Sequence, residues 1–370
     1  MGGRLFHTAA ASFEAARRLA NRPVGDRARR LHGHSFVARI HAEVPADCAQ
    51  PPRGETDSLA GLLEREVTAL DYSDLNEHLQ VPSDENLARW LSARLATVGL
   101  ESVWIQSTKE QGAELVGHPG RLRVWRRFRF EAAHWLPNVA PDHQCGRLHG
   151  HGFEVILYAW QDSIDAGSDA QDGAVDSDRL AGLWAPLHDQ LHHRCLNDIP
   201  GLENPTSELL ARWIWERLEP RLPTLSWVGV LETSTAGCCY DGQDFRIWKA
   251  LRFEAALQRR RLPRDDPRRL WHGHSYKLRL HLRAPLDEVL GWTVDYGDVK
   301  ALFTPAYRLL DHQALNDLPG LSDTDPGSLA RWIREQAAEG LPQLDGIELE
   351  ETPGRGVALC AARLWPGLPI

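Results

Sequence analysis

The feature that most constrains the fold is a motif that occurs three times along the chain. Each occurrence has the form Phe-Glu-Ala-Ala followed, after a loop, by His-Gly-His. The three His-Gly-His motifs begin at His32, His149 and His272, so they are 117 and 123 positions apart. This spacing is far longer than the roughly 20 to 50 residues of solenoid repeats, so each repeat is predicted to be a small domain. The predicted domains are residues 1–120, 121–243 and 244–370.

The same order of elements can be recognised in every repeat. In the second repeat, two strand-like runs with alternating apolar residues, 122–133 and 153–160, flank the motif. Two helices follow, and the second has an apolar stripe at helical spacing in each repeat. The predicted starts of these second helices are Ser83, Asn204-Pro205 and Asp325-Pro326. Two further strands close each repeat, so the predicted pattern is ββααββ.

Short linkers join the repeats, and they favour a closed ring. Residues 117–120 and 241–244 separate the repeats, and neither linker is a long flexible tether. A four-stranded sheet has two open edges that must be paired or covered. Three such sheets joined edge to edge would leave no open edge, so we expect an α+β fold whose three sheets close into a ring.

Composition excludes several classes of protein. The net charge is -9 and the isoelectric point is near 6.0, which argues against a nucleic-acid partner. No apolar run is long enough for a membrane span, and the first residues lack a signal-peptide core. Six cysteines occur without a CxxC pair, so reduced thiols and a cytoplasmic location are expected.

The second repeat alone contains a full set of candidate metal ligands. Residues two apart on a strand point to the same face, so His149 and His151 can converge on one ion while Gly150 leaves room for the backbone. His134, at the end of the neighbouring strand, supplies a third nitrogen. Three histidines with an open fourth position are typical of a catalytic zinc site. The alternative is that these histidines only fill a polar rim.

A cysteine lies four positions before the second His-Gly-His motif. Cys145 could present a thiolate beside the bound cation, whose positive charge would lower the thiol pKa. The alternative is a small buried apolar residue, which is the commoner role of a free cysteine. The equivalent residues of the other repeats, Ala28 and Arg268, have no such chemistry.

Three stretches of the second repeat resemble a known family. The stretches FEAAHWLPNVAPDHQCGRLHGH, CLNDIPGLENPTSE and LETSTAGC resemble the 6-carboxytetrahydropterin synthases of the wider 6-pyruvoyl-tetrahydropterin synthase family. The resemblance covers residues 121–242 and, more weakly, most of the remaining chain. It implies the tunnelling fold (T-fold), in which three subunits form a twelve-stranded barrel and two trimers often stack. This chain resembles such a trimer written as one polypeptide, and a homodimer of two stacked chains is expected.

The resemblance also implies roles for individual residues. His134, His149 and His151 match the family's zinc ligands, and Cys145 matches its catalytic cysteine. The family's Asp-His pair is intact only as Asp311-His312, whereas the second repeat has His192-His193 and the first has Asp71-Tyr72. His193 therefore remains a candidate catalytic residue. The glutamate that binds the pterin ring, in a Glu-Thr pair, matches Glu232-Thr233 and Glu351-Thr352, but Ser107 replaces it in the first repeat.

These losses are complementary, because in the family the cysteine and the Asp-His pair come from adjacent subunits. The second repeat has the cysteine without the aspartate, and the third has the Asp-His pair without the cysteine. We therefore expect one working site per chain between the second and third repeats, with Asp311-His312 serving Cys145. The opposite handedness of the ring would present Asp71-Tyr72 instead, and the site would be incomplete.

The implied activity is a zinc-dependent lyase reaction on 7,8-dihydroneopterin triphosphate that gives 6-carboxy-5,6,7,8-tetrahydropterin, a precursor in the queuosine pathway. The alternatives are 6-pyruvoyl-tetrahydropterin synthase activity and a pterin-binding scaffold without catalysis. Arginine-rich loops precede the first and third His-Gly-His motifs. They either receive the triphosphate or only solvate their loops, and a charge run is more often a solvated face.

Overall fold

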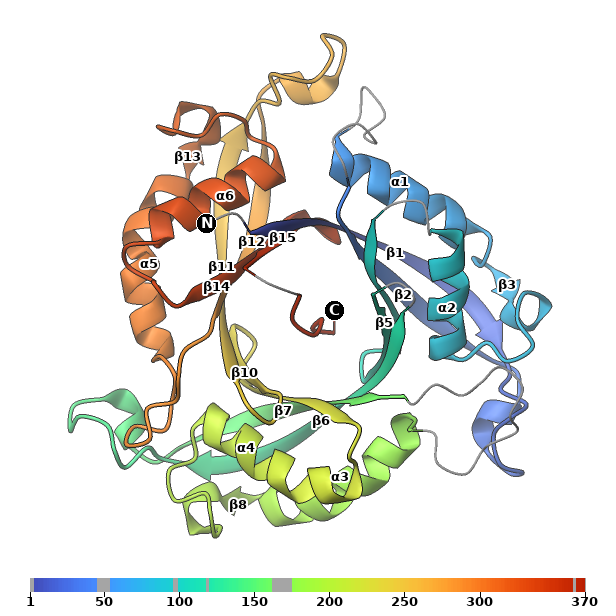
Figure 1. Cartoon of the computed structure of the whole chain (residues 1–370), viewed down its shortest axis with the longest axis vertical. Helices are drawn as coiled ribbons and strands as arrows, with labels where there is room; N and C mark the ends of the chain where they lie inside the picture. The colour runs from blue at the N-terminus through green and yellow to red at the C-terminus, as the bar shows by residue number, and fades with distance from the viewer. Residues whose placement is uncertain are drawn as a thin grey trace.

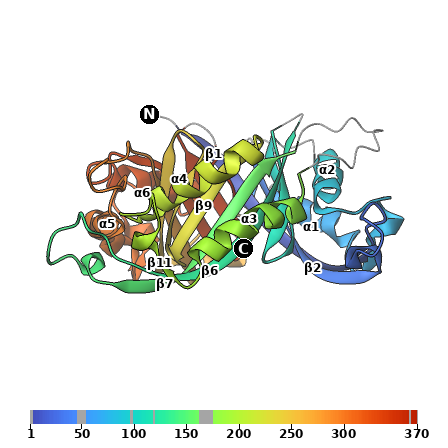
Figure 2. The same ribbon diagram turned by 90° about the horizontal axis from the view of Figure 1, so that it is seen from below.

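The computed structural model describes residues 3–44, 54–95, 99–117, 120–161, 175–361 and 364–369. Twelve long strands form a closed antiparallel barrel, and the helices surround it (Figure 1). The molecule is flatter along the barrel axis than across it (Figure 2). This architecture confirms the barrel that the resemblance implies.

Each repeat contributes four long strands to the barrel. Those of the first repeat are β1 (Arg4–Arg17), β2 (His32–Ala42), β4 (Leu100–Thr108) and β5 (Gln111–Val116). Those of the second are β6 (Arg121–His134), β7 (His149–Trp160), β9 (Leu225–Thr233) and β10 (Ala236–Tyr240). Those of the third are β11 (Phe245–Leu257), β12 (His272–Leu282), β14 (Leu344–Thr352) and β15 (Arg355–Cys360).

The ring closes through three antiparallel pairings between repeats. Strand β5 pairs with β6, β10 pairs with β11, and β15 returns to pair with β1. Within the described residues, every long strand therefore has a partner on both sides, which leaves the barrel without an open edge. The predicted edge-to-edge ring is confirmed.

The described part of the chain contains six α-helices, which pack on the outside of the barrel. They are α1 (Glu55–Thr68), α2 (Asp84–Arg94), α3 (Ser177–Leu191), α4 (Ser207–Leu218), α5 (Tyr296–Leu310) and α6 (Pro326–Ala337). The predicted caps at Ser83 and Asp325 are confirmed. The predicted start of α4 at Asn204-Pro205 is wrong, because Thr206 caps this helix. The Asn204 amide instead donates to the carbonyl oxygen of Leu290 in the third repeat, at 2.8 Å.

A two-residue strand follows the first helix of each repeat, and the sequence did not indicate it. These strands are β3 (Ser73–Asp74), β8 (Arg194–Cys195) and β13 (Gln313–Ala314), and each pairs in parallel with the first strand of its repeat. The preceding residues Tyr72, His193 and His312 have φ values of 53°, 57° and 57°. Residues with side chains seldom adopt this left-handed conformation. The Asp-His position of each repeat is therefore a tight turn.

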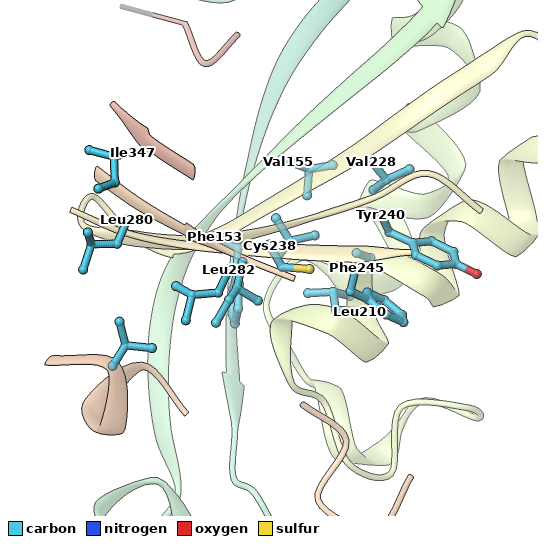
Figure 3. Packing of buried hydrophobic residues seen from close by; sticks show 14 of the residues in the cluster. Phe153, Val155, Leu210, Val228, Cys238, Tyr240, Phe245, Leu280, Leu282 and Ile347 are labelled. Atoms are coloured by element: carbon cyan, nitrogen blue, oxygen red, sulfur yellow. The ribbon is translucent and has the colours of Figure 1, made fainter. Parts of the chain in front are cut away.

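Two apolar layers lie on the two faces of the barrel wall. The outer layer packs the strands against the helices, and one continuous cluster joins the second and third repeats. Figure 3 shows part of it, with Val155 of β7, Leu210 of α4 and Leu280 of β12. The inner layer includes Trp104, Trp125, Tyr158, Trp227 and Trp248.

The C-terminal residues 364–369 lie inside the barrel (Figure 1). Trp365 stacks on His281 with ring centroids 3.7 Å apart. The Tyr158 hydroxyl donates to the carbonyl oxygen of Gly367 at 2.7 Å, and Leu368 packs among the inner tryptophans. This segment therefore fills part of the barrel lumen. Among the described residues, no helix has the length and apolar character needed to cross a membrane.

Candidate active site

The three histidines of the second repeat meet where β6 ends and β7 begins. His134 pairs with His149 in the register of the two strands, and His151 lies two residues further on. Their candidate ligand nitrogens all lie within 4.8 Å of one another. His134 is 1% exposed, so the group sits on the covered, helix-facing side of the sheet. The prediction that these three histidines converge on one point is confirmed.

Backbone carbonyl groups orient two of the rings. His134 Nδ1 lies 3.0 Å from the carbonyl oxygen of Pro205, and His149 Nδ1 lies 2.7 Å from that of Arg147. A carbonyl oxygen can only accept, so each Nδ1 carries the proton and each Nε2 keeps its lone pair. The Nε2 atom of His134 is buried without a hydrogen-bond partner in the described structure. A metal ion would satisfy this atom.

The protonation of the histidines also fits a cation. Burial, with smaller contributions from the neighbouring His149 and His151, lowers the pKa of His134 to about 4. Burial lowers the pKa of His151 in the same direction. A neutral imidazole is the form that binds a metal. At neutral pH these two side chains are therefore in the ligand form, and the donor set fits a three-histidine metal site.

Cys145 lies on a short 3₁₀ turn, Gln144–Gly146, in the loop between β6 and β7. His143 caps this turn, because its Nδ1 accepts the backbone N–H of Cys145 at 3.2 Å. The carbonyl oxygen of Cys145 accepts the N–H of Leu136 at 2.8 Å, which holds the other side of the loop. Burial raises the pKa of the Cys145 thiol, and the carboxylates of Glu232 and Asp295 raise it further.

Residues of the third repeat complete the surroundings of Cys145. Asp295, the N-cap of α5, has its Oδ2 atom 3.5 Å from His143 Nε2. The side-chain amide of Asn138 donates to the carbonyl oxygen of Val289 at 2.6 Å. The group therefore lies between the second and third repeats. The equivalent aspartates of the other repeats, Asp57 and Asp176, also contact a neighbouring repeat, through Arg268 and Arg22.

Glu232 lies beside the thiol, and a second glutamate, Glu208, lies close to Glu232. Burial raises the pKa of Glu232 to about 8, with smaller contributions from the charges of Glu208 and Asp295. Glu208 is 2% exposed, and its Oε1 accepts the backbone N–H of Thr293 at 2.8 Å. Thr233 is exposed beside Glu232. The sequence missed Glu208, although it lies within the Pro-Thr-Ser-Glu stretch that carries part of the resemblance.

Within one chain, Asp311 and His312 are not brought to Cys145. They follow the C-terminal end of α5, whereas Asp295, beside Cys145, caps its N-terminal end. The 15 residues of this helix span about 22 Å. Asp311 accepts the backbone N–H of Glu254 at 3.0 Å and lies 3.0 Å from His312 Nδ1. The His312 side chain is 77% exposed.

The corresponding positions of the other repeats are also directed away from the metal site. His193 lies 3.2 Å from the Glu131 carboxylate. Glu131 is three residues before His134 on β6, so the two side chains point to opposite faces of the sheet. In the first repeat, Asp71 accepts the N–H of Glu14 at 2.9 Å, and the neighbouring Tyr72 is 86% exposed. All three positions lie on the rim of the barrel.

The outer repeats fill the equivalent positions with arginine ion pairs. Arg17 occupies the position of His134 and binds Asp84 at 2.7 Å in a buried pair. Leu257 occupies that position in the third repeat. There, Glu351 is 16% exposed and binds Arg259, while the Tyr276 hydroxyl donates to it at 3.3 Å. The predicted pterin-binding role of Glu351 would require this pair to open.

Two curated relatives match part of this chain. The 6-carboxy-5,6,7,8-tetrahydropterin synthase of Synechocystis is 40% identical over 119 residues, which are 32% of this chain and 91% of that protein. The dihydroneopterin monophosphate aldolase of Pyrococcus furiosus is 30% identical over 103 residues, which are 28% of this chain and 80% of that protein.

Similar solved structures include a pterin enzyme and a uricase. The 6-pyruvoyl tetrahydropterin synthase of Caenorhabditis elegans has 19% identity and a TM-score of 0.29, covering 30% of this chain and 92% of that one. The uricase of Arthrobacter globiformis has 12% identity and a TM-score of 0.34, covering 61% of this chain and 80% of that one.

A family model, described as 6-pyruvoyl tetrahydropterin synthase, matches the chain three times. The matched residues are 7–116, 123–243 and 246–361. Together they account for nearly the whole sequence, and the chain therefore belongs to the 6-pyruvoyl tetrahydropterin synthase family.

Proposed function

We propose that this protein is a zinc-dependent 6-carboxytetrahydropterin synthase with one working site per chain, acting on 7,8-dihydroneopterin triphosphate. The observation that carries the proposal is a conjunction at one interface. Three metal-ligating histidines, Cys145 and Glu232 lie together there, and only the second repeat has all of them. The 40% identity with a 6-carboxy-5,6,7,8-tetrahydropterin synthase supports this choice of reaction.

His134, His149 and His151 would hold the zinc ion through their Nε2 atoms. When bound, the ion would polarise the side-chain hydroxyl groups of the substrate and make them more acidic. Glu232 and Thr233 would bind the pterin ring, because a carboxylate can accept hydrogen bonds from adjacent ring N–H and amino groups. Protons from such donors would also offset the cost of ionising a buried carboxyl whose pKa is raised to about 8.

Cys145 would move a proton on the substrate side chain. The loop that carries it follows the end of β6, so the thiol can approach a substrate bound between the metal site and Glu232. Burial and two carboxylates raise the thiol pKa in the absence of cations. A cation at the histidines would oppose this effect, because a positive charge favours the thiolate.

Asp311 and His312 would act from a second chain stacked on the same end of the barrel. The loop bearing Cys145 and the turn bearing His312 both lie at the end where β6, β7, β11 and β12 meet their hairpin loops. The exposure of His312 leaves it free to enter a partner's site. This arrangement keeps the predicted role of the pair but transfers it from the same chain to a homodimer.

A metal assay with product analysis tests the function. Purified protein should contain one zinc per chain and convert dihydroneopterin triphosphate to the 6-carboxy product with release of triphosphate and acetaldehyde. The Cys145→Ala variant should keep its zinc and lose turnover. Accumulation of the 6-pyruvoyl or a hydroxymethyl product would indicate a different reaction of the same site. Zinc and pterin binding without any product would identify a scaffold.

Mixing two inactive variants tests the second chain. Cys145→Ala and His312→Ala should each be inactive alone. A mixed dimer would combine an intact Cys145 from one chain with an intact His312 from the other, so activity should return on mixing. Full activity of His312→Ala by itself would contradict a catalytic role for this residue. Inactivity of both the variant and the mixture would contradict action from a second chain.

A further inference from the structure

A cavity of about 1330 Å³ lies between the first and second repeats. Its lining includes Arg17, His32 and His34, which correspond to the three metal-ligating histidines, and Ala28, which corresponds to Cys145. Asp176, the counterpart of Asp295, closes it from the second repeat. The cavity therefore occupies the place in the ring that corresponds to the candidate active site, and it is large enough for a small-molecule ligand.

The floor of this cavity carries a permanent cation where the second repeat carries its metal site. Arg17 is 3% exposed, and its Nη1 donates to the carbonyl oxygen of Pro82 at 3.0 Å and to Asp84 at 2.7 Å. The Ser107 hydroxyl donates to the other Asp84 oxygen at 2.6 Å. The Arg17 Nε atom is buried without a hydrogen-bond partner in the described structure. A guanidinium cannot be removed by a chelator or by a rise in pH within the physiological range.

Three further arginines line the cavity without a carboxylate partner. Arg27, Arg30 and Arg89 are exposed, and none of their side chains forms an ion pair within the described part of the chain. Arg22 differs, because Asp26, Asp176 and Asp178 bind it. Three unpaired guanidinium groups at one opening form a surface suited to phosphate oxygens.

The histidine and the carboxyl groups of the cavity bear on whether an anion can bind there. Burial lowers the pKa of His34 to about 4, so this ring is neutral and can donate or accept a hydrogen bond. Burial raises the pKa of Glu85. The acidic groups that remain are held by Arg17 and Arg22. The lining contains five arginines and five carboxyl groups, so the unpaired positive charge is local to Arg27, Arg30 and Arg89 at the mouth.

The corresponding interface between the third and first repeats differs in how its arginines are paired. Arg268, which replaces the cysteine there, binds Asp57 and Asp266. Arg259 binds Glu351, so the carboxylate of the Glu-Thr pair is already neutralised. Arg259, Arg261 and Arg268 of the third repeat are thus used in internal ion pairs, whereas Arg27, Arg30 and Arg89 around the first cavity remain available.

We propose that the cavity between the first and second repeats is a metal-independent binding site for a phosphorylated small molecule. Arg27, Arg30 and Arg89 bind the phosphate groups at the mouth, and the buried Arg17–Asp84 ion pair forms the floor in place of a metal site. The proposal does not depend on the lyase reaction, because none of these arginines adjoins Cys145 or the metal-ligating histidines.

Calorimetric titration of the zinc-loaded full-length protein with tripolyphosphate tests this site. The double substitution Arg27→Ala and Arg30→Ala should weaken binding at least tenfold, because two charge-assisted contacts are lost. The matched control is Arg260→Ala and Arg264→Ala in the corresponding loop of the third repeat, which should change the affinity less than twofold. The zinc content and the melting temperature of both variants should match the wild type.

A second titration with adenosine triphosphate separates two sources of the phosphate. Affinity equal to that of tripolyphosphate would show that the site recognises a phosphate chain alone, and tighter binding would show that it also accommodates a ring system. Both outcomes support the proposal if the double substitution weakens binding. Equal weakening in the control, an unaffected affinity in the double variant, or no binding of either ligand would overturn it.

Discussion

His143 occupies a position at which the other two repeats have an aspartate. Asp26, His143 and Asp266 each cap the same 3₁₀ turn by accepting a backbone N–H two residues later, at 2.8, 3.2 and 2.9 Å. Only the histidine can cap this turn without adding a negative charge and also reach Asp295 with its second nitrogen. The histidine occurs in the repeat that has the cysteine. It therefore both caps the turn and avoids a further negative charge near the thiol.

Replacing this histidine by aspartate should therefore raise the thiol pKa. His143→Asp keeps a capping oxygen but places a third carboxylate near Cys145, besides those of Glu232 and Asp295. We expect the Cys145 pKa to rise by roughly half a unit or more, which can be measured from the pH dependence of its alkylation by iodoacetamide in the metal-free protein. His143→Asn, a neutral cap, is the control. Identical alkylation profiles for the two variants would contradict this electrostatic role.

At the scale of elements, the strand pair that carries the histidines is the same in all three repeats. His32 and His34 have ring centroids 5.0 Å apart, the same separation as His149 and His151. His32 Nδ1 also lies 2.7 Å from a backbone carbonyl oxygen, as His149 Nδ1 does. The first repeat therefore retains two oriented imidazoles and lacks only the third.

Restoring that third imidazole should create a second metal site. The change is Arg17→His together with Asp84→Ser, because removing Arg17 alone would leave a buried unpaired carboxylate. Ser207 is the residue that the second repeat has at the position of Asp84. We expect about two zinc ions per chain by elemental analysis.

The control for this experiment is Arg17→Leu with Asp84→Ser, which copies Leu257 of the third repeat and should leave the metal content at the wild-type value. An equal zinc content in the histidine and leucine variants would show that the strands of the first repeat do not place three histidines in a geometry that binds zinc.

The repeats, their element order and the histidine triad could be predicted because they depend on local patterns. Period-two and period-3.6 apolar spacing fixed the strands and helices, and the register of one hairpin joins His134 to His149. The location of Asp311-His312 could not be predicted, because it depends on which end of α5 faces the neighbouring repeat. The contact of His143 with Asp295 depends on the same inter-repeat geometry. The ion pair of Arg259 with Glu351 depends on how two distant segments of the third repeat pack together.

At the scale of the whole molecule, the lumen of the barrel is filled partly by the chain itself. Trp365 and Leu368 are each 6% exposed, and the segment joins β2, β7 and β12 through contacts with Arg39, Tyr158 and His281. No periodic pattern marks these residues in the sequence, since the segment has neither helical nor strand spacing. Its position follows only from the presence of a closed ring wide enough to admit it.

Truncating this internal segment should destabilise the entire ring. Trp365→Ala should lower the free energy of unfolding by about 3 to 5 kcal/mol, because it removes a buried indole and leaves a cavity beside His281. The measurement is urea-induced unfolding followed by circular dichroism. Trp271→Ala is the control, since Trp271 is 54% exposed and its loss should change the free energy by less than about 0.5 kcal/mol. Equal effects of the two substitutions would show that the segment does not stabilise the barrel.

The pairing of β15 with β1 has a consequence for synthesis of the chain. Strand β1 leaves the ribosome before β15, which is its neighbour on the side away from β2. Until β15 arrives, β1 exposes unpaired backbone groups that can pair with a strand of another nascent chain. The same open edge could accept β15 of a second molecule. Two chains could then exchange their β15 strands. Short translation delays or high local concentration should therefore favour strand-swapped assemblies over the closed monomeric ring.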